Sequence, residues 1–150
     1  MTDYRTSADH QLALNTYIKL VRCTNSVSSD IHSHLPAGLT VSQFGILEAL
    51  YHLGPMPQKE LARKILKSAG NITTIINNLE KSGLVIRSAG ERDRRFVQVS
   101  LTSKGQDQIE QLFPPHADRI LQRMARLSKH DQKKLGQLLS KLADHKSGQK

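Results

Sequence analysis

Three arginines and two acidic residues fall within five consecutive positions, Glu91 to Arg95. The segment that contains them, "GERDRRFVQVSLT", continues into a run in which apolar and polar residues alternate. This period of two predicts a β-strand, which places the charged cluster at the tip of a hairpin. Its acids and arginines could simply pair with one another on the surface, although exposed pairs contribute only about 0 to 1 kcal/mol. An excess of arginine favours contact with an anion, such as the narrow and strongly negative minor groove of A·T-rich DNA.

A second polar surface is predicted between residues 70 and 81. Four apolar side chains of this segment recur at helical spacing and are expected to face a core. The opposite side carries Gly70, Asn71, Thr73, Thr74, Asn77 and Lys81. Thr and Asn form helices poorly, and a merely solvated face would usually carry more Glu, Lys and Gln. In a DNA major groove, by contrast, Asn can pair with adenine, and Thr can bond a base or a phosphate.

Three neighbouring residues could support this helix on a nucleic acid. Gly70 would allow the backbone to approach a phosphate closely, and Ser68 and the helix N-terminus add hydrogen-bond donors. Gln58 is expected at the start of the preceding helix. In a helix-turn-helix the first helix crosses the DNA backbone, so we interpret Gln58 as a candidate phosphate contact.

The elements that must position these residues can be read from apolar periodicity and from helix-ending residues. Helices are predicted over 12–35, over 41–53 behind an N-cap at Thr40, from about Pro57, and up to about Lys81, where Gly83 ends the helix. The runs "LVIRS" and "FVQVSL" are predicted strands. A further helix should start at Thr102 and be kinked or broken at Phe113–Pro115, because proline removes a helix hydrogen bond. A last helix should follow Ser128.

The predicted order is helix, helix, helix-turn-helix, hairpin, helix, helix. This is the winged-helix arrangement, in a mainly α fold whose only β structure is the hairpin wing. The terminal helices carry apolar stripes that the small helices and the hairpin cannot cover. We therefore expect a second copy of the chain to cover these stripes, which would give a homodimer.

The chain resembles the MarR family of bacterial transcription regulators over roughly residues 12–142. The resemblance is carried by "ELARKI", "TTIINNLEKSGLVIR" and "DRRFVQVSLTSKG", in this order and at the spacings of the family. It implies one domain over 1–150, with a helical dimerisation lobe at 8–36 and 103–145 and a winged helix-turn-helix lobe at 40–102. It also implies a homodimer that binds a pseudo-palindromic operator, usually as a repressor released by a small molecule or by oxidation.

The resemblance assigns roles within the wing and predicts an effector site. Arg95 matches the wing arginine of the family, Asp93 matches the acid that helps to hold it, and Arg94 could serve the phosphates or share the groove. A pocket between the lobes, near Tyr51, His52 and the first helix, is implied. We expect a small anionic or phenolic effector there, although no motif identifies ligand-binding residues.

Composition is consistent with this interpretation and argues against other classes. The chain has 22 basic and 13 acidic residues, a net charge of +9, which favours anionic partners. No apolar run resembles a signal peptide or approaches the roughly 18 residues of a membrane span, so we expect a cytoplasmic protein. No catalytic motif is recognised, and neither an enzymatic function nor a cofactor is predicted.

Two further features invite sensor chemistry. The single cysteine, Cys23, could sense oxidants, but it stands closer to the second helix than the sensing cysteine of peroxide-responsive relatives does. We interpret it as a small, partly buried side chain. His32 and His34 form an H-x-H pair whose members lie on different faces of a helix, so no metal site is predicted. The alternative to a DNA-binding regulator is a winged-helix module that binds proteins without reading DNA.

Overall fold

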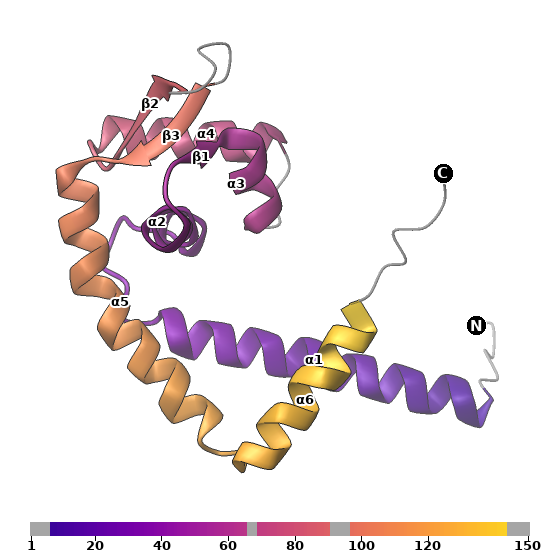
Figure 1. Cartoon of the computed structure of the whole chain (residues 1–150). Helices are drawn as coiled ribbons and strands as arrows, with labels where there is room; N and C mark the ends of the chain where they lie inside the picture. The colour runs from indigo at the N-terminus through magenta and orange to yellow at the C-terminus, as the bar shows by residue number, and fades with distance from the viewer. Residues whose placement is uncertain (1–6, 66–68, 91–96, 144–150) are drawn as a thin grey trace. The chain divides into compact units, whose positions relative to one another are not determined.

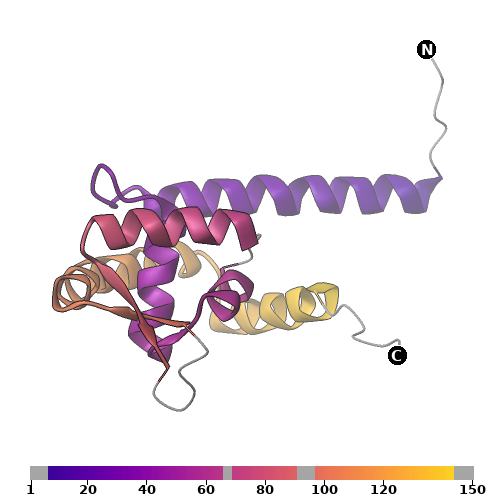
Figure 2. The same ribbon diagram turned by 90° about the horizontal axis from the view of Figure 1, so that it is seen from above.

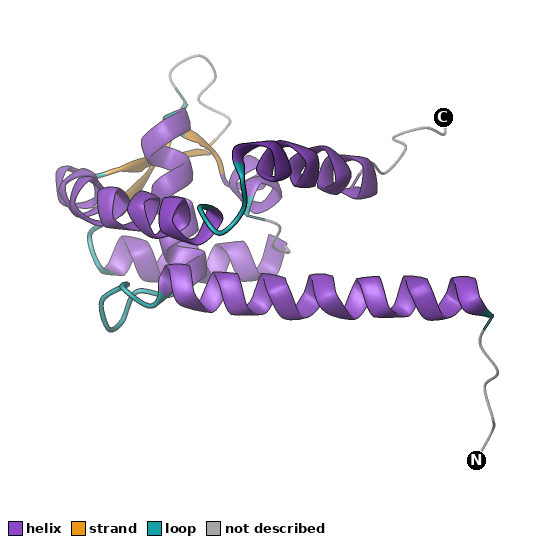
Figure 3. Cartoon of the chain, turned by 90° about the horizontal axis from the view of Figure 1, so that it is seen from below, coloured by secondary structure: helices purple, strands orange, loops and turns teal. Residues whose placement is uncertain are grey.

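The computed structural model describes residues 7–65, 69–90 and 97–143 of the chain. Helices dominate this part of the chain, and the strands form one small sheet (Figures 1 and 3). In chain order the elements are α1 (Ala8–His32), α2 (Val41–Leu53), β1 (Met56–Pro57), α3 (Gln58–Lys64), α4 (Ala69–Lys81), β2 (Val85–Ala89), β3 (Val97–Leu101), α5 (Ser103–Met124) and α6 (Lys129–Ala143). The predicted mainly α fold with a small hairpin is confirmed.

The chain divides into two compact units. His32–His116 forms one, called here the central unit, which contains α2 to α4 and the sheet. Met1–Ile31 and Ala117–Lys150 form the other, called here the terminal unit. Each unit is described by itself below.

The sheet of the central unit has three antiparallel strands in the order β1-β3-β2. The hairpin of β2 and β3 was predicted and is seen clearly in Figure 2. The short strand β1 was not predicted, because Gly54–Pro57 was interpreted only as a breaker. Met56 lies opposite Val99 and Pro57 opposite Gln98. A proline is tolerated at this edge of the sheet, since its missing N–H need not bond a further strand.

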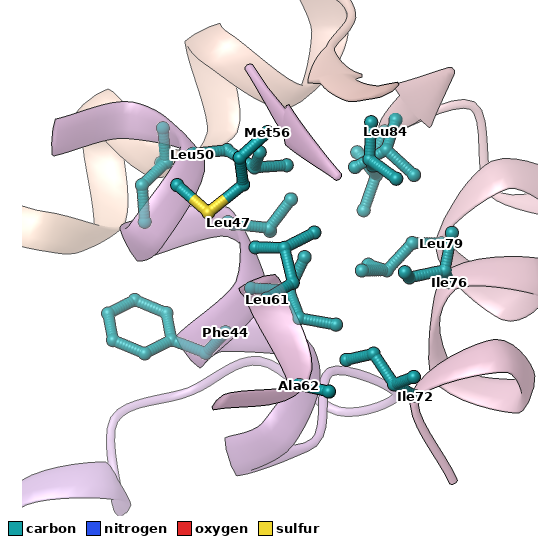
Figure 4. Close-up of a cluster of buried hydrophobic side chains, with 14 residues drawn as sticks. Phe44, Leu47, Leu50, Met56, Leu61, Ala62, Ile72, Ile76, Leu79 and Leu84 are labelled. Atoms are coloured by element: carbon teal, nitrogen blue, oxygen red, sulfur yellow. The ribbon is translucent and has the colours of Figure 1, made fainter. Parts of the chain in front are cut away.

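The hydrophobic core of the central unit lies between α2, α3, α4 and the sheet (Figure 4). Phe44, Ile46, Leu47 and Leu50 of α2 are buried. In the sheet, Val99 is fully buried, whereas Val97, at the far end of β3, is exposed. Each fully buried Leu, Ile or Phe side chain contributes roughly 1.5 to 3 kcal/mol, so this core is the main source of stability for the unit.

The start of α2 and the end of α4 are capped by the expected residues. Thr40 Oγ1 accepts a hydrogen bond from Gln43 N at 3.2 Å, and Gln43 Oε1 accepts one from Thr40 N at 2.8 Å. This is a full capping box. Gly83 ends α4 with a φ of +73°, and Leu84 N then donates to Leu79 O at 3.0 Å. That bond is the signature of a glycine-terminated helix.

The start of α5 is locked onto the end of α4. Thr102 Oγ1 accepts from Gly105 N at 3.0 Å and donates to Gly83 O at 2.6 Å. A Cβ on Gly105 would fall on the carbonyl oxygen of Leu84. The "LTxxG" spacing at Leu101–Gly105 therefore has two physical causes: a hydroxyl that caps the helix and a glycine that allows close backbone contact.

The helix α5 continues through Pro114 and Pro115. Of the two predicted outcomes, a kink or a break, the break is wrong, and the kink stays a prediction. Two prolines deprive the carbonyls of Glu110 and Gln111 of their helix partners, but both residues are exposed, so water can satisfy these groups.

The terminal unit is held by polar contacts between α1 and the last turns of α5. Arg119 donates to the carbonyl of Asp30 at 3.3 Å, and Arg123 donates to Ser26 Oγ at 3.0 Å. Arg123 also lies 3.5 Å from the carboxylate of Asp30. No residue of α6 is buried.

Large apolar side chains of the terminal unit remain exposed within a single chain. They include Leu12, Leu14, Tyr17, Ile18 and Val21 of α1, Ile120 and Leu121 of α5, and Leu135, Leu138, Leu139 and Leu142 of α6. An apolar surface of this extent is typical of a protein–protein contact. None of the described helices has both the length and the apolar character to span a bilayer.

Candidate nucleic-acid interface

The helix α4 divides sharply into a buried and an exposed side. Ile72, Ile76 and Leu79 are fully buried against the core, and Ile75 is partly buried. Asn71, Thr73, Thr74, Asn77 and Lys81 are exposed on the other side, where their spacing placed them. The helix therefore presents a small polar surface whose backbone is fixed from behind by apolar packing.

Gln58 joins the start of α3 to this surface. Its Nε2 donates to Thr73 Oγ1 at 2.6 Å, so the structure brings two of the predicted site residues together. The sequence suggested that Gln58 faces a phosphate. In the structure its amide is directed at α4, where it contacts Thr73, and the phosphate contact stays a prediction.

A residue that the sequence analysis gave no role, Arg87 of β2, lies at the centre of the site. Its Nη1 donates to Glu80 Oε2 at 2.6 Å, and its backbone N donates to Glu80 Oε1 at 3.1 Å. Its Nη2 donates to Asn77 Oδ1 at 2.8 Å and to Gln58 Oε1 at 3.4 Å. One guanidinium thus connects α3, α4 and β2.

The Glu80–Arg87 pair lies in a half-buried position, with 38% and 23% of the two side chains exposed. Charge-assisted bonds of this length are stronger than neutral ones. Both residues stand in the segment that carries the family resemblance, but only the fold shows that a strand arginine reaches back to the end of the preceding helix. No periodicity in the sequence reveals such a contact.

Part of the predicted site lies outside the described residues. Ser68, Asp93, Arg94 and Arg95 belong to this part, and their predicted roles stay predictions. Gly70 lies in the first turn of α4. The last described pair of the hairpin, Ala89 and Val97, flanks the segment that contains the wing arginines.

A cavity of about 570 Å³ opens in the central unit between the end of α1, α2 and the end of α3. Apolar side chains such as Phe44, Leu53 and Ile65 form much of its wall. Its polar lining consists of Ser42, Glu48, Lys64, His32 and His52. His52 and the first helix were expected beside a pocket and do line this one, whereas Tyr51 does not. The mixture of apolar walls and a few polar groups is typical of a small-molecule site.

Next to this cavity lies a cluster of imidazole rings. The ring of His116 is buried. Its centroid lies 4.6 Å from that of the Phe44 ring, and 5.1 and 5.4 Å from those of the His32 and His34 rings. Burial, with the charges of His32 and His34 as smaller causes, lowers the pKa of His116 to about 4. At neutral pH this ring is therefore uncharged.

The histidine cluster does not amount to a metal site in the described residues. No group of three or more potential ligands there has the arrangement that a metal ion needs. His116 Nδ1 makes no hydrogen bond within this part of the chain. Sequence reasoning missed the cluster because His116 is remote in the chain from the H-x-H pair.

Cys23 is a free, exposed cysteine on α1. The expectation that it is partly buried is wrong. Within one chain, the described part of the terminal unit packs too few side chains against α1 to cover it.

Comparisons with known proteins find relatives that cover most of the chain. A family model described as "MarR family" matches residues 39–97. The uncharacterised HTH-type transcriptional regulator YkoM of Bacillus subtilis is 34% identical over 134 residues, which cover 89% of this chain and 87% of that protein. A structure of a probable transcriptional regulator from Pseudomonas aeruginosa is 31% identical with a TM-score of 0.70, covering 82% of this chain and 92% of its own.

A more distant structure shares the fold. The organohalide-sensing regulator RdhR, in its 2,4-dichlorophenol-bound form, is 22% identical with a TM-score of 0.78, and the match covers 97% of this chain and 89% of that chain.

Proposed function

Because the chain belongs to the MarR family of transcription regulators, we propose that it binds a pseudo-palindromic DNA operator as a homodimer and leaves it when a small molecule binds. The observation that carries the proposal is the exposed face of α4, which offers Asn and Thr side chains on a helix fixed by buried Ile72, Ile76 and Leu79. Such a face matches the hydrogen-bonding groups of a major groove. In this proposal Ser68, Gly70, Asn71, Thr73, Thr74 and Asn77 form the groove-facing set.

The wing completes the proposed interface. Arg94 and Arg95 would enter the minor groove or contact phosphates beside it, with Asp93 holding Arg95. A two-fold dimer would place its recognition helices about 34 Å apart, one turn of DNA, so that each half of a palindrome meets one helix. The exposed apolar face of the terminal unit supports the dimer, because a second copy would cover it.

The proposed effector is a small anionic or phenolic molecule in the cavity of the central unit. Lys64 supplies a cation at its wall, and Glu48 supplies an acceptor for a phenolic hydroxyl. The chlorophenol bound by the fold relative RdhR is of this chemical class. Release of bound operator by 2,4-dichlorophenol tests this part, and a phenol that leaves the complex intact at saturating concentration argues against it.

The function is tested by removing the wing cations with the double substitution Arg94→Ala and Arg95→Ala. We expect operator affinity to fall at least about tenfold, together with a shallower dependence of affinity on salt, because fewer counterions are released. Binding is measured by fluorescence anisotropy over a salt series.

The matched control removes two cations from the terminal unit. Lys129 and Lys133 lie on the side of α6 opposite its leucines by helical spacing. The substitutions Lys129→Ala and Lys133→Ala should leave affinity nearly unchanged. Equal affinity of the wing variant and the unaltered protein would favour the alternative, a winged-helix module that binds proteins.

A further inference from the structure

Arg87 fixes the orientation of the Asn77 amide, and we propose that it thereby sets which base edge α4 reads. The inference rests on the proposed function, since it concerns how the same helix recognises DNA. It adds a pair of residues that determines specificity. Arg87 of the strand positions the amide of Asn77, and Asn77 of the helix contacts the base.

The orientation of Asn77 follows from chemistry as well as from distance. A guanidinium has only hydrogen-bond donors, so the group that faces it at 2.8 Å must be the amide oxygen of Asn77. The same reasoning applies to Gln58, whose Oε1 faces Arg87 and whose Nε2 is consequently directed at Thr73. Both amides are thus held in one orientation by a single cation.

The cation is itself immobilised. Glu80 accepts one bond from the side chain of Arg87 at 2.6 Å and another from its backbone N at 3.1 Å. A guanidinium held by a carboxylate on one side cannot turn its remaining donors away from Asn77 without breaking a charge-assisted bond.

What remains for a ligand is the Nδ2 amine of Asn77. Among the described residues this amine donates to no protein group, and Asn77 lines a shallow hollow of about 300 Å³ together with Glu80 and Lys81. The side chain is exposed. Asn77 therefore offers its amine donors to whatever enters this hollow, while one of the two lone pairs of its oxygen already accepts from Arg87.

An amide whose oxygen already accepts from a fixed cation is a poorer match for the base that asparagine usually selects. The paired contact with adenine requires the amide oxygen to accept from N6 while the amine donates to N7. Because Arg87 occupies one lone pair of the oxygen and fixes the direction of the amide, Asn77 matches better the edges that present acceptors to its amine: O6 and N7 of guanine, or O4 of thymine. This differs from the pairing with adenine that is open to an asparagine in a major groove in general.

The test is selection of bound sequences from a random DNA pool by the full-length protein. For the unaltered chain we expect guanine or thymine at the position that Asn77 contacts in each half-site. Asn77→Asp keeps an oxygen for Arg87 but replaces the outward amine with a carboxylate oxygen. At that position it should reduce the enrichment of the preferred base about tenfold and favour cytosine, whose N4 donates a hydrogen bond.

Two further variants distinguish the positioning of Asn77 by Arg87 from a general effect on DNA affinity. Asn78→Asp adds the same charge one residue along α4, and it should weaken binding to all sequences without changing that position. Arg87→Lys keeps the charge but cannot bond Glu80, Gln58 and Asn77 together, so adenine should become accepted there. A merely structural link would lower affinity without altering base preference.

Each outcome decides between the two claims. If Asn77→Asp removes a preference for adenine, or if both Asn77→Asp and Arg87→Lys leave every preference unaltered, the inference is overturned while the proposed function stands. If the unaltered protein enriches no sequence, the proposed function fails and the inference fails with it.

Discussion

His116 is a histidine that the fold keeps uncharged. In the unfolded chain it would titrate near its ordinary pKa of 6.5, whereas in the folded chain its pKa is about 4. Between these values the unfolded state binds more protons than the folded state, so protonation favours unfolding. The stability that depends on neutral His116 is complete above pH 6.5 and is lost as the pH falls toward 4.

We therefore predict that the free energy of unfolding falls between pH 6.5 and 4, by up to about 3 kcal/mol from this residue. Urea unfolding followed by circular dichroism at a series of pH values measures it. His116→Gln should flatten this dependence, whereas His130→Gln, which removes an exposed histidine of α6, should not. Parallel curves for the His116 variant and the unaltered protein would contradict the assignment.

For single residues, the sequence predicts which side of a helix a side chain faces better than it predicts which residues that side chain contacts. Helical spacing alone placed Ile72, Ile76 and Leu79 inside and Asn77 outside. It could not predict that Asn77 shares a cation with Gln58, because that contact depends on where β2 returns after α4. The same limit applies to His116, whose neighbours in space are remote in the chain.

Among the elements, the junction of α4, β2 and α5 depends most on backbone geometry. Gly105 lies so close to the Leu84 carbonyl that no side chain fits between them. Leu84 O also accepts a hydrogen bond from Thr102 N at 3.1 Å, so the carbonyl is not free to move away. The turn into α5 therefore cannot relax around a larger residue.

We predict that Gly105→Ala destabilises the protein by about 2 kcal/mol or more, through overpacking against backbone atoms. Gly136→Ala is the matched control, since a Cβ at that position of α6 meets nothing within 4 Å. The control should raise stability by up to about 1 kcal/mol, because alanine favours a helix. Thermal unfolding of both variants decides the matter, and an unimpaired Gly105→Ala would show that the contact can open.

Most elements could be predicted, and the failures have physical causes. Caps at Thr40 and Gly83 gave helix ends because their side-chain and backbone chemistry is local. The strand β1 was missed because a two-residue strand next to a proline has no period to detect. Of the kink or break predicted at Phe113–Pro115, the break does not occur, because exposed carbonyls can bond water and the helix continues.

For the molecule as a whole, the main open surface is the apolar face of the terminal unit. The leucines of α6 recur at helical spacing and form one stripe, which the described residues of the same chain leave exposed. The net charge of +9 opposes close association of two copies, so apolar burial must supply the attraction in the proposed dimer.

We predict that Leu138→Glu shifts the protein from dimer to monomer. Leu138 is 55% exposed in the single chain, and a carboxylate buried there against a second copy would be unpaired. Light scattering at micromolar concentration gives the mass. Ser140→Glu places the same charge on the other side of α6 and should leave the dimer intact. An unaltered chain that is already monomeric would exclude the proposed assembly.

The two prolines of α5 come just before Ala117, where the central unit gives way to the terminal unit. A helix that lacks two successive backbone hydrogen bonds bends more easily at that turn than along the rest of its length. In the proposed dimer, bending would be concentrated at this turn, so an operator whose half-sites are spaced slightly differently could be accommodated without repacking the hydrophobic core of the central unit.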